Sequence, residues 1–584
     1  MAFKNRQLYS NYWGWIPTAE TPALLFDIET NGLLDQTTKI HCICAMDWLT
    51  KETFSFGPTE IEDGLKLMAR YPLWVAHNGL CFDIPVLRKL HQRSPDHAFD
   101  TLVASRLIWT DLTDHDFNRI RSEGKRSGRA GQVPIDFPKK LIGRHSLEAW
   151  GYRLGCYKGD YGKQVNAWDS WSQEMQEYCE QDVQVLAKLY EHILNQNYAP
   201  EALALEHEFQ KVIFQQEQTG VHFNKAKAVE MYAELASKRD QLVRELQEEF
   251  PPKIEEEVFI PKVNNRTRGY VKGVPFIKKF TIPFNPSSRQ HIAERLIGLG
   301  WQPSEFTETG QPMVDETVLS ALPYPCCKKL VEYLELTKII GMLAEGNQAW
   351  LKLVTDKDRI HGRVITCGAV TGRCTHNSPN LAQIPARGTY GHQCRELFTA
   401  PDGWSMLGCD ASGLELRMLA SYMARYDGGK YGKVILEGDI HTENQNAAGL
   451  PTRNDSKTFI YALLYGAGDA KLGSIVAPTS SEAVQAKKGK ALRAKFYKNI
   501  PALMRLTEDV QASAKSRGFL FGIDGRKLNI RSQHSALNTL LQSAGAVMMK
   551  LATVIFHWEM EMAGFFEGED YTQVLHVHRL HCGR

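Results

Sequence analysis

The 584-residue sequence lacks most features that would place it outside the ordinary globular proteins. The formal net charge is only +2, which excludes a polybasic tail protein but leaves room for local nucleic-acid-binding patches. None of the 12 cysteines has zinc-ligand spacing, and their scatter is typical of a reduced cytosolic protein. The N-terminus has no apolar signal stretch, and no segment approaches the ~18–20 apolar residues of a membrane span. We therefore expect a soluble protein without a membrane partner.

The content that remains is that of a folded, multidomain chain. Apolar residues make up 43% and charged residues 23% of the sequence. A single hydrophobic core stops growing at about 250–300 residues, so at least two domains are expected. The first begins with buried strands at 23–28 and 73–76, each followed by a turn and a helical pattern, as in an α/β sheet. A helix is expected at 173–195, after which the pattern fades.

The rest of the chain alternates between helical and irregular segments. Residues 203–247 are helical and charged, which predicts long surface helices. Residues 250–286 predict short strands or an irregular tip, and helices return at 413–425 and 453–465. Strands are expected at 404–410, which ends in Asp410, and at 572–577, which His578 follows.

Three acidic segments in the first domain follow one another in a telling order. Asp27-Ile-Glu29 ends the first strand, where both carboxylates point to one face. Asn78-Gly-Leu-Cys-Phe-Asp83 follows the second strand, and Tyr178-Cys-Glu-Gln-Asp182 places a tyrosine and an aspartate on one helix face. Taken singly, each has an ordinary interpretation: a solvated strand end, a helix cap at Asp83, and an exposed helical pair.

Taken as a set, the three segments resemble the motifs of the DnaQ-like 3′–5′ exonucleases over about residues 20–195. The resemblance implies a two-metal site that hydrolyses the 3′ end of a DNA strand. It implies that Tyr178 orients the attacking water. The implied metal ligands are Asp27, Glu29, Asp83 and Asp182. All of these positions are filled, so an active exonuclease is expected.

The second half contains an unusual helical stripe. Arg453, Lys457, Tyr461 and Tyr465 recur at steps of four, with Gly466 at the end as a cap. A core stripe would be apolar, and a solvated stripe would rarely combine two cations with two tyrosines. Cations for phosphates and aromatic rings for a base indicate a nucleotide site.

This stripe and Asp410-Ala-Ser-Gly-Leu-Glu415-Leu-Arg417 resemble motifs B and A of the family A (pol I-like) DNA polymerases. Thr371-Gly-Arg373, Gly438-Asp-Ile-His441 and Asn538-Thr-Leu-Leu-Gln542 also match. The details are similar to the branch found in T-odd short-tailed phages, and the resemblance covers essentially the whole chain.

The resemblance implies a role for each matched residue. Asp410 and the Ala411 carbonyl would hold the two catalytic metal ions, and Glu415 would crowd the ribose 2′ position. Tyr461 would pack on the incoming nucleotide and Tyr465 would lie near the template. His441, Arg453 and Lys457 would bind the triphosphate. Arg373, Asn538 and Gln542 would contact the DNA, with Arg373 and Gln542 at minor-groove acceptors that all correct base pairs share.

One palm segment departs from the family. The family places His-Asp-Glu after a palm strand, and its Asp is the second metal-bridging carboxylate; here Arg579 and Leu580 follow His578. The resemblance therefore predicts a palm truncated at motif C and impaired synthesis. Three explanations stay open: an intron, intein or split gene with a second polypeptide completing the palm; a frameshift or an artificial end that replaces the true tail; or a genuine nuclease or DNA-binding protein that has lost synthesis.

The resulting hypothesis has a fold class, an activity and partners. The fold is α/β and α+β multidomain: an RNase H-like exonuclease domain followed by a right-hand polymerase with an incomplete palm. The function is template-directed DNA polymerisation in phage replication with 3′–5′ proofreading; the alternative is an exonuclease and DNA-binding fragment without synthesis. The domains are 1–195 exonuclease, 196–355 thumb and connecting helices, 356–430 the first palm segment, 431–535 fingers and 536–584 the second, truncated palm segment.

The resemblance also implies the molecules that bind. They are primer–template DNA, deoxynucleoside triphosphates, and two Mg²⁺ ions at each site, with Mn²⁺ as a substitute. The coliphage relatives carry a long thumb insertion that recruits host thioredoxin, whereas this chain has only about 248–284 there, so thioredoxin dependence is not expected. The expected location is the cytoplasm of the infected bacterial host.

Overall fold

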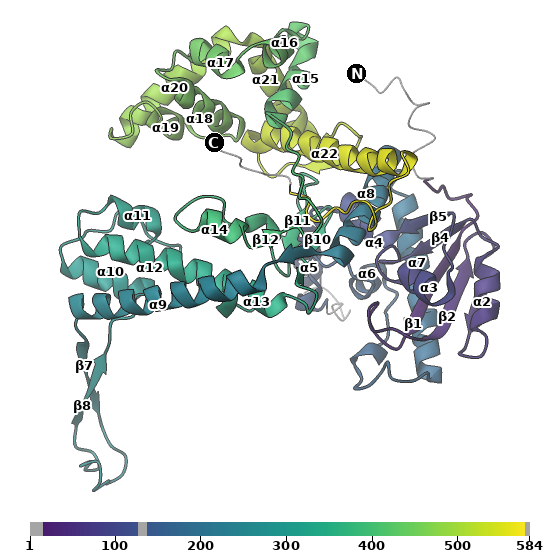
Figure 1. The fold of residues 1–584 in the computed structure, drawn as a ribbon, viewed down its shortest axis with the longest axis horizontal. Helices are drawn as coiled ribbons and strands as arrows, with labels where there is room; N and C mark the ends of the chain where they lie inside the picture. The colour runs from purple at the N-terminus through teal and green to yellow at the C-terminus, as the bar shows by residue number, and fades with distance from the viewer. Residues whose placement is uncertain (1–15, 127–136, 578–584) are drawn as a thin grey trace. The chain divides into compact units, whose positions relative to one another are not determined.

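The computed structural model describes residues 16–126 and 137–577 (Figure 1). The chain divides into two compact units. The first contains the chain up to Thr219, the segment Val364–His376 and the chain from Gly408 onward; the second contains Gly220–Arg363 and Asn377–Leu407.

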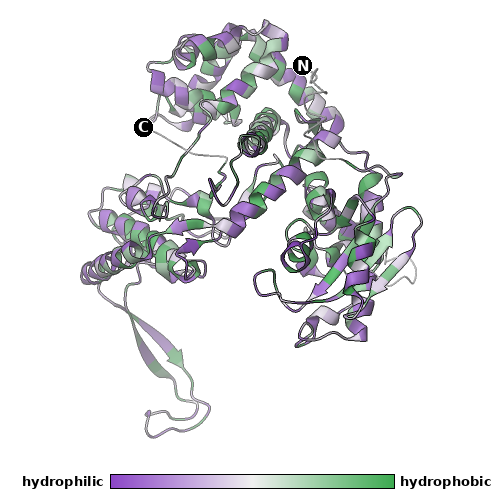
Figure 2. Ribbon diagram, turned by 45° about the vertical axis from the view of Figure 1, so that its right-hand side comes forward, coloured by the Kyte–Doolittle hydropathy of each residue, from purple (hydrophilic) through white to green (hydrophobic). Residues whose placement is uncertain are grey.

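A five-stranded sheet in the order β3-β2-β1-β4-β5 forms the centre of the N-terminal region of the first unit. β1 (Leu24–Thr30) pairs antiparallel with β2 (Ile40–Asp47) and parallel with β4 (Leu73–Ala76). The outer strands are β3 (Thr53–Phe56) and β5 (His97–Asp100). The central strands are buried on both faces, and Figure 2 shows them largely in hydrophobic colours. The two predicted strands are confirmed.

Helices cover this sheet, and one of them crosses its centre. α7 (Gln173–Leu194) packs against β1 and β2, and it confirms the predicted helix. Ser172 caps it by accepting a hydrogen bond from the Met175 amide. The other helices of this region are α2 (Ile61–Met68), α3 (Asp83–His91), α4 (Thr101–Ile108), α5 (Leu112–Arg126) and α6 (Leu147–Leu154).

Two long helices form the core that follows. α8 (Pro200–Thr219) packs against α22 (Ala536–Met562) and buries polar side chains together with apolar ones. The prediction of surface helices over 203–247 is therefore wrong for α8, because Glu206 and His207 are buried and have partners on other elements. The expectation that no segment could span a membrane also needs correction: residues 533–562 are long and apolar enough by length and composition. However, 61% of their most apolar 18-residue window is buried inside the protein, as in a core helix.

The remaining helices of the first unit form a separate apolar cluster around Phe459 and Phe496. The predicted helices 413–425 and 453–465 are confirmed as α15 (Leu414–Asp427) and α18 (Arg453–Leu464). A short hairpin, β13 (Phe519–Phe521) and β14 (Lys527–Asn529), precedes α22. The other members are α16 (Lys430–Glu437), α17 (Ile440–Ala448), α19 (Asp469–Ser474), α20 (Glu482–Asn499) and α21 (Pro501–Arg517).

The second unit is built on the long helix α9 (Lys225–Glu249), which packs against α12 (Cys326–Ile340). A hairpin of β7 (Lys253–Phe259) and β8 (Phe276–Ile282) extends from it, which confirms short strands within 250–286 (Figure 1). Its small sheet has the order β12-β6-β9. The other elements are β6 (Val221–Phe223), α10 (Arg289–Gly298), α11 (Glu316–Ala321), α13 (Trp350–Leu353), β9 (Arg359–Ile360), α14 (Gly391–Arg395) and β12 (Phe398–Thr399). Two short strands, β10 (Arg363–Ile365) and β11 (Thr375–Asn377), pair with each other where the chain passes from one unit to the other.

Two predicted strands are wrong. Residues 404–410 have no regular secondary structure, and Leu407 in this segment is 85% exposed. Residues 572–577 are also irregular. A strand is stable only when a neighbour satisfies its backbone groups, and neither segment has such a neighbour among the described residues. An apolar run therefore does not suffice to form a strand here. His578 lies outside the described residues.

Candidate functional site

The acidic residues of the first domain converge on one face of the sheet. Asp27 and Glu29 project from β1 toward α7, where Asp182 lies one turn after Tyr178. Asp83 is the first residue of α3; the helix has no side-chain cap, so the capping interpretation is wrong. The carboxylates of Glu29, Asp83 and Asp182 are buried, and the charge of each raises the pKa of Asp27. The fold thus brings together three segments that the sequence separates by more than 150 residues.

The electrostatics of this cluster favour a cation. Burial raises the pKa of Asp27 well above its ordinary range, and the neighbouring carboxylates of Glu29, Asp182 and Asp83 raise it further. Burial likewise raises the pKa of Glu29 to about 8, of Asp83 to about 7 and of Asp182 to about 6. The buried Oδ1 of Asp182 has no hydrogen-bond partner among the described residues. An unpaired carboxylate oxygen within a cluster of four carboxylates fits a divalent-metal site.

Lys158 supplies the positive charge that this cluster has in the protein alone. Its ammonium forms an ion pair with Asp182 and lies 4.5 Å from the centre of the Tyr178 ring. Burial lowers the pKa of Lys158, but the charges of Asp182, Tyr178 and Asp27 and the hydrogen bond to Asp182 together outweigh burial and hold that pKa above its usual range. Tyr161 and Trp168 pack near the Tyr178 ring and fix its position. The hydroxyl therefore stays near the carboxylates.

The acidic cluster opens into a cavity of about 1100 Å³. Asp27, Asp182 and Lys158 are among the residues that line it. Cationic and imidazole groups also line it, and they come from both the exonuclease-like region and the segment after β14: Arg106, Arg144, His145 and Arg531. A mixed acidic and basic lining of this size can accept a phosphodiester chain whose end reaches the carboxylates.

Asp100, at the end of β5, holds the loop that presents Asp83. Its carboxylate accepts hydrogen bonds from the amides of Asn78 and Leu80, at 3.0 and 3.1 Å. Its own amide donates to Nε2 of His207 on α8, at 2.9 Å. Asp100 thus ties the loop to the sheet, and α8 in turn holds the backbone of Asp100.

In the second half, Glu415 joins two of the predicted nucleotide-site and DNA-site residues. Its Oε1 accepts a hydrogen bond from the Tyr465 hydroxyl at 2.8 Å and from the Arg373 guanidinium at 3.2 Å. The Tyr461 ring lies 6.4 Å from the Tyr465 ring, one turn earlier on α18. Gly466 has φ +77°, which suits a glycine after the helix end. The aromatic end of the predicted stripe therefore lies beside the first turn of α15.

The cationic end of the stripe lies near His441. Arg453 binds Asp439 through two hydrogen bonds of 2.6 and 3.1 Å, and Asp439 is the N-cap of α17, on which His441 lies. Ser456 of α18 donates to the His441 carbonyl at 2.8 Å. Lys457 is exposed on the same helix. The structure thus places His441, Arg453 and Lys457 on two adjoining helices.

Other predicted residues are not gathered into this group. Asp410 is exposed, and its side chain makes no hydrogen bond or ion pair within the described ranges. Ala411 follows it in the irregular segment before α15. Asn538 and Gln542 lie one turn apart on α22 and are joined by a hydrogen bond of 2.8 Å.

Comparison with known proteins identifies this arrangement. Residues 274–578 match the sequence pattern of DNA polymerase family A, and residues 24–194 match that of the RNase H superfamily. The chain is 39% identical to the DNA-directed DNA polymerase of Escherichia phage T7, over 90% of this chain and 88% of that protein. The chain belongs to DNA polymerase family A. The DNA-directed DNA polymerase of Enterobacteria phage T3 matches with the same identity and coverage.

The fold of this family A polymerase is shared with a more distant solved structure. The POL domain of Pol1 from M. smegmatis, solved in complex with DNA primer–template and dNTP, superposes with a TM-score of 0.67. The sequence identity is 16%, and the match covers 98% of this chain and 90% of that one. Both the RNase H-like and the family A components of the predicted fold class are confirmed.

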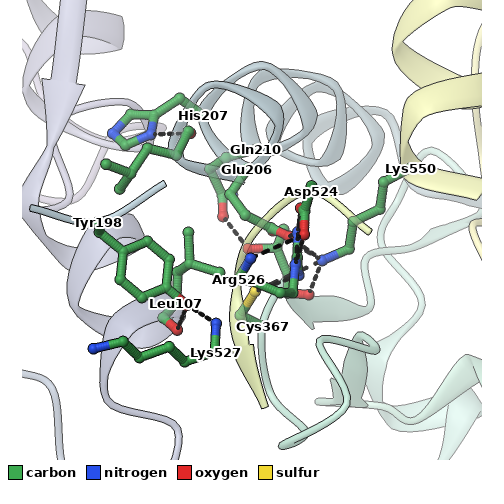
Figure 3. Close-up of polar contacts among 12 residues, drawn as sticks. Leu107, Tyr198, Glu206, His207, Gln210, Cys367, Asp524, Arg526, Lys527 and Lys550 are labelled. Carbon is green, nitrogen blue, oxygen red and sulfur yellow. Dashed lines mark hydrogen bonds and ion pairs between the residues drawn. The ribbon is translucent and has the colours of Figure 1, made fainter. Parts of the chain in front are cut away.

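A buried ion cluster supports the segment that carries Arg373 in this polymerase (Figure 3). Glu206 of α8 lies between Lys550 of α22, at 2.6 and 2.8 Å, and Arg526 of the β13–β14 hairpin, at 2.9 Å. Lys550 also donates to the Thr366 carbonyl at 2.8 Å. Gly372, at φ +75°, lies so close to Arg526 that a Cβ there would overlap Nη1. The cluster therefore fixes both ends of the segment 366–372.

Sequence reasoning missed Lys158 and this ion cluster. Lys158 lies in a loop after α6, with no motif spacing to Asp182. Glu206 lies hundreds of residues before Arg526 and Lys550, and each of the three looks like a surface charge in its own segment. Lys550 is the one Asp, Glu, Lys or Arg between Ala536 and Trp558, and this charge within a largely apolar stretch is the sequence signal for a buried ion pair.

Proposed function

We propose that this chain is a replicative phage DNA polymerase that proofreads with a 3′–5′ exonuclease site at Asp27, Glu29, Asp83, Tyr178 and Asp182. The observation that carries the exonuclease proposal is the convergence of four carboxylates whose pKa values burial raises. Such a cluster is costly in a fold unless cations occupy it. The unpaired Oδ1 of Asp182 supports the same assignment.

The four carboxylates would hold two Mg²⁺ ions, or Mn²⁺ in their place, and the ions would supply an activated water and charge stabilisation at the phosphate. Tyr178 would orient the attacking water; the packing of its ring and the effect of the nearby Asp182 charge on its hydroxyl support this role. Lys158 neutralises Asp182 before the ions bind and then becomes available to a phosphate oxygen. The cavity with Arg106 and Arg531 would accept the single strand.

The exonuclease is tested with a 5′-labelled single-stranded oligonucleotide and Mg²⁺. Wild type should shorten it from the 3′ end. Asp182→Asn should lower the rate by at least about 10³-fold, because it removes the negative charge and one oxygen of a proposed metal ligand. Asp63→Asn removes an exposed carboxylate of a surface pair and is the matched control. Equal rates for Asp182→Asn and Asp63→Asn would remove the proposal.

In the polymerase half, we assign nucleotide binding to His441, Arg453, Lys457, Tyr461 and Tyr465, and DNA contacts to Arg373, Asn538 and Gln542. Asp410 and the Ala411 carbonyl would bind the catalytic metal ions, and Glu415 would discriminate against the ribose 2′-hydroxyl. The hydrogen bonds from Arg373 and Tyr465 to Glu415 support a shared site for primer end and nucleotide. Deoxynucleoside triphosphate binding is measured by equilibrium titration of Lys457→Met against wild type.

We further propose that synthesis by this chain is impaired, because Arg579 stands where the family has a metal-binding aspartate. Residues 578–584 lie outside the described residues, so the proposal rests on residue identity alone. The alternative, an exonuclease and DNA-binding fragment without synthesis, rests on the same residue. Under either proposal, a second polypeptide that supplies the metal-binding aspartate would restore synthesis.

Primer extension distinguishes these possibilities. The assay uses the Asp27→Ala background so that degradation does not mask extension. The expected extension does not exceed that of Asp27→Ala/Asp410→Asn, which lacks the remaining palm carboxylate. Robust extension above that background would refute the argument from Arg579.

The remaining assignments concern partners and place. We assign residues 1–195 to the exonuclease domain and 196–355 to the thumb, whose β7–β8 hairpin is short. A thioredoxin partner is therefore not proposed, and co-purification with host thioredoxin would overturn this. The chain would act in the cytoplasm of the infected bacterial host.

A further inference from the structure

Three thiols from two elements meet beneath the exonuclease carboxylates. Cys42 and Cys44 lie two residues apart on β2 and so share a face, and Cys179 lies on α7 across from them. Their sulfur atoms all lie within 4.8 Å of one another, and all three residues are 0–1% exposed. Three mutually close sulfur donors are a ligand set for a thiophilic metal ion.

A fourth donor comes from the catalytic cluster itself. Asp27 faces Cys44 in the β1–β2 register, and its Oδ2 is 3.7 Å from the Cys179 sulfur. Asp27, Glu29 and Cys179 also form a group whose ligand atoms lie within 4.8 Å of one another. Cys179 therefore belongs both to the thiol cluster and to the edge of the carboxylate cluster.

The geometry is close to that of a tetrahedral site. A zinc–sulfur bond of about 2.3 Å separates the ligands of a regular tetrahedron by roughly 3.8 Å. The three sulfur atoms lie within 4.8 Å of one another, and Asp27 Oδ2 lies 3.7 Å from the Cys179 sulfur, so Asp27 joins the set by turning toward the other two sulfurs. Asp27 lines the 1100 Å³ cavity, so an ion that enters the cavity meets the carboxylate that contacts Cys179. Cysteines that only fill a core need neither a carboxylate donor nor a route from solvent.

We propose that Cys42, Cys44, Cys179 and Asp27 form a site for a thiophilic divalent cation such as Zn²⁺ or Cd²⁺. On binding, each thiol releases its proton to solvent, and Asp27 turns from the carboxylate cluster to the thiol cluster. Because the magnesium ions of the proposed exonuclease need Asp27, occupancy of the thiol site inhibits that activity. This consequence rests on the proposed function, whereas the metal site itself does not.

The metal site is tested without any activity measurement. Reduced full-length protein is titrated with Cd²⁺ in excess Mg²⁺, and the ultraviolet sulfur-to-cadmium charge-transfer band is recorded. Wild type should bind one Cd²⁺ with this band, and Cys44→Val should lose the band and bind at least about tenfold more weakly. Cys394→Val removes a thiol that is equally buried but lies in the second unit, and it should behave as wild type. Cys44→Ser repeats the test with a polar replacement in case valine disturbs the core.

The inhibition is tested separately with Zn²⁺ in the exonuclease assay. Wild type should lose activity as the thiol site fills, while Cys44→Val should keep it at the same Zn²⁺ concentration. A missing band in wild type, or an equal band in Cys44→Val, overturns the site. A normal band with unchanged exonuclease activity overturns the shared role of Asp27. If the protein has no exonuclease activity, the proposed function fails but the cadmium titration still decides the site.

Discussion

Replacing Lys550 by methionine tests the buried ion cluster most directly. Lys550 is fully buried and makes three hydrogen bonds of 2.6–2.8 Å, two to Glu206 and one to the Thr366 carbonyl. Methionine keeps the volume but removes the charge, so Glu206 and Asp524 are left with Arg526 as their one buried cation in the cluster. Removing one partner of a buried pair typically costs about 3–5 kcal/mol.

Amide hydrogen exchange in α22 measures this cost locally, which avoids assuming two-state unfolding for a multidomain chain. A loss of about 3–5 kcal/mol makes exchange roughly 10²- to 10⁴-fold faster, since about 1.4 kcal/mol is a factor of ten. The double variant Glu206→Gln/Lys550→Met removes both charges, so α22 should lose less local stability in it than in Lys550→Met alone.

Lys66→Met is the matched control, because Lys66 pairs with Asp63 at the surface and 69% of its side chain is exposed. It should leave exchange unchanged. If α22 exchanges equally fast in Lys550→Met and Lys66→Met, the cluster does not stabilise the core. A double variant that loses more than Lys550→Met would show that Glu206 is not paired mainly with Lys550.

Two further predictions concern the proposed exonuclease site, and a third concerns the contact between Gly372 and Arg526. Because the pKa of Glu29 is raised to about 8, the metal-free fold binds more protons than the unfolded chain. The stability of the metal-free fold therefore falls as pH rises from the ordinary glutamate range to about 8. The Mg²⁺-induced rise in melting temperature should accordingly grow from about pH 6 to about pH 9. A Mg²⁺ effect independent of pH, or unchanged in Glu29→Gln, contradicts this. Tyr178→Phe should lower exonuclease kcat about 10²-fold with KM unchanged, and a change in KM alone would assign the hydroxyl to substrate binding. Gly372→Ala should weaken primer–template affinity in a fluorescence titration and destabilise the fold by roughly 1–3 kcal/mol, because φ is +75° and the added carbon meets Arg526. The control is Gly269→Ala, since Gly269 also has a positive φ but lies in open space. Equal effects of the two substitutions on affinity would refute the role of Arg526.

Short-range patterns in the sequence were sufficient for much of this protein. The spacing of Asp27 from Glu29, and of Tyr178 from Asp182, fixes which side chains share a face of a strand or helix, because that depends only on local backbone periodicity. The strands at 24–30 and 73–76 and the helix at 173–194 were predictable for the same reason. The family followed from the same motifs.

Partners distant in sequence were not predictable. The strand expected at 404–410 does not form, since pairing requires a neighbour that the local sequence cannot supply. The sequence predicts α8 as a surface helix, because nothing near Glu206 indicates that its carboxylate will pair with Lys550.

The order of the three acidic motifs was thus determined by the sequence, together with the residue types that a metal site needs. Only the tertiary structure decided that Lys158 neutralises Asp182 and that Cys179 lies between a thiol cluster and Asp27. The physical reason is that local spacing fixes the direction of each side chain along its own element, whereas the charge or sulfur it meets depends on how separate elements pack.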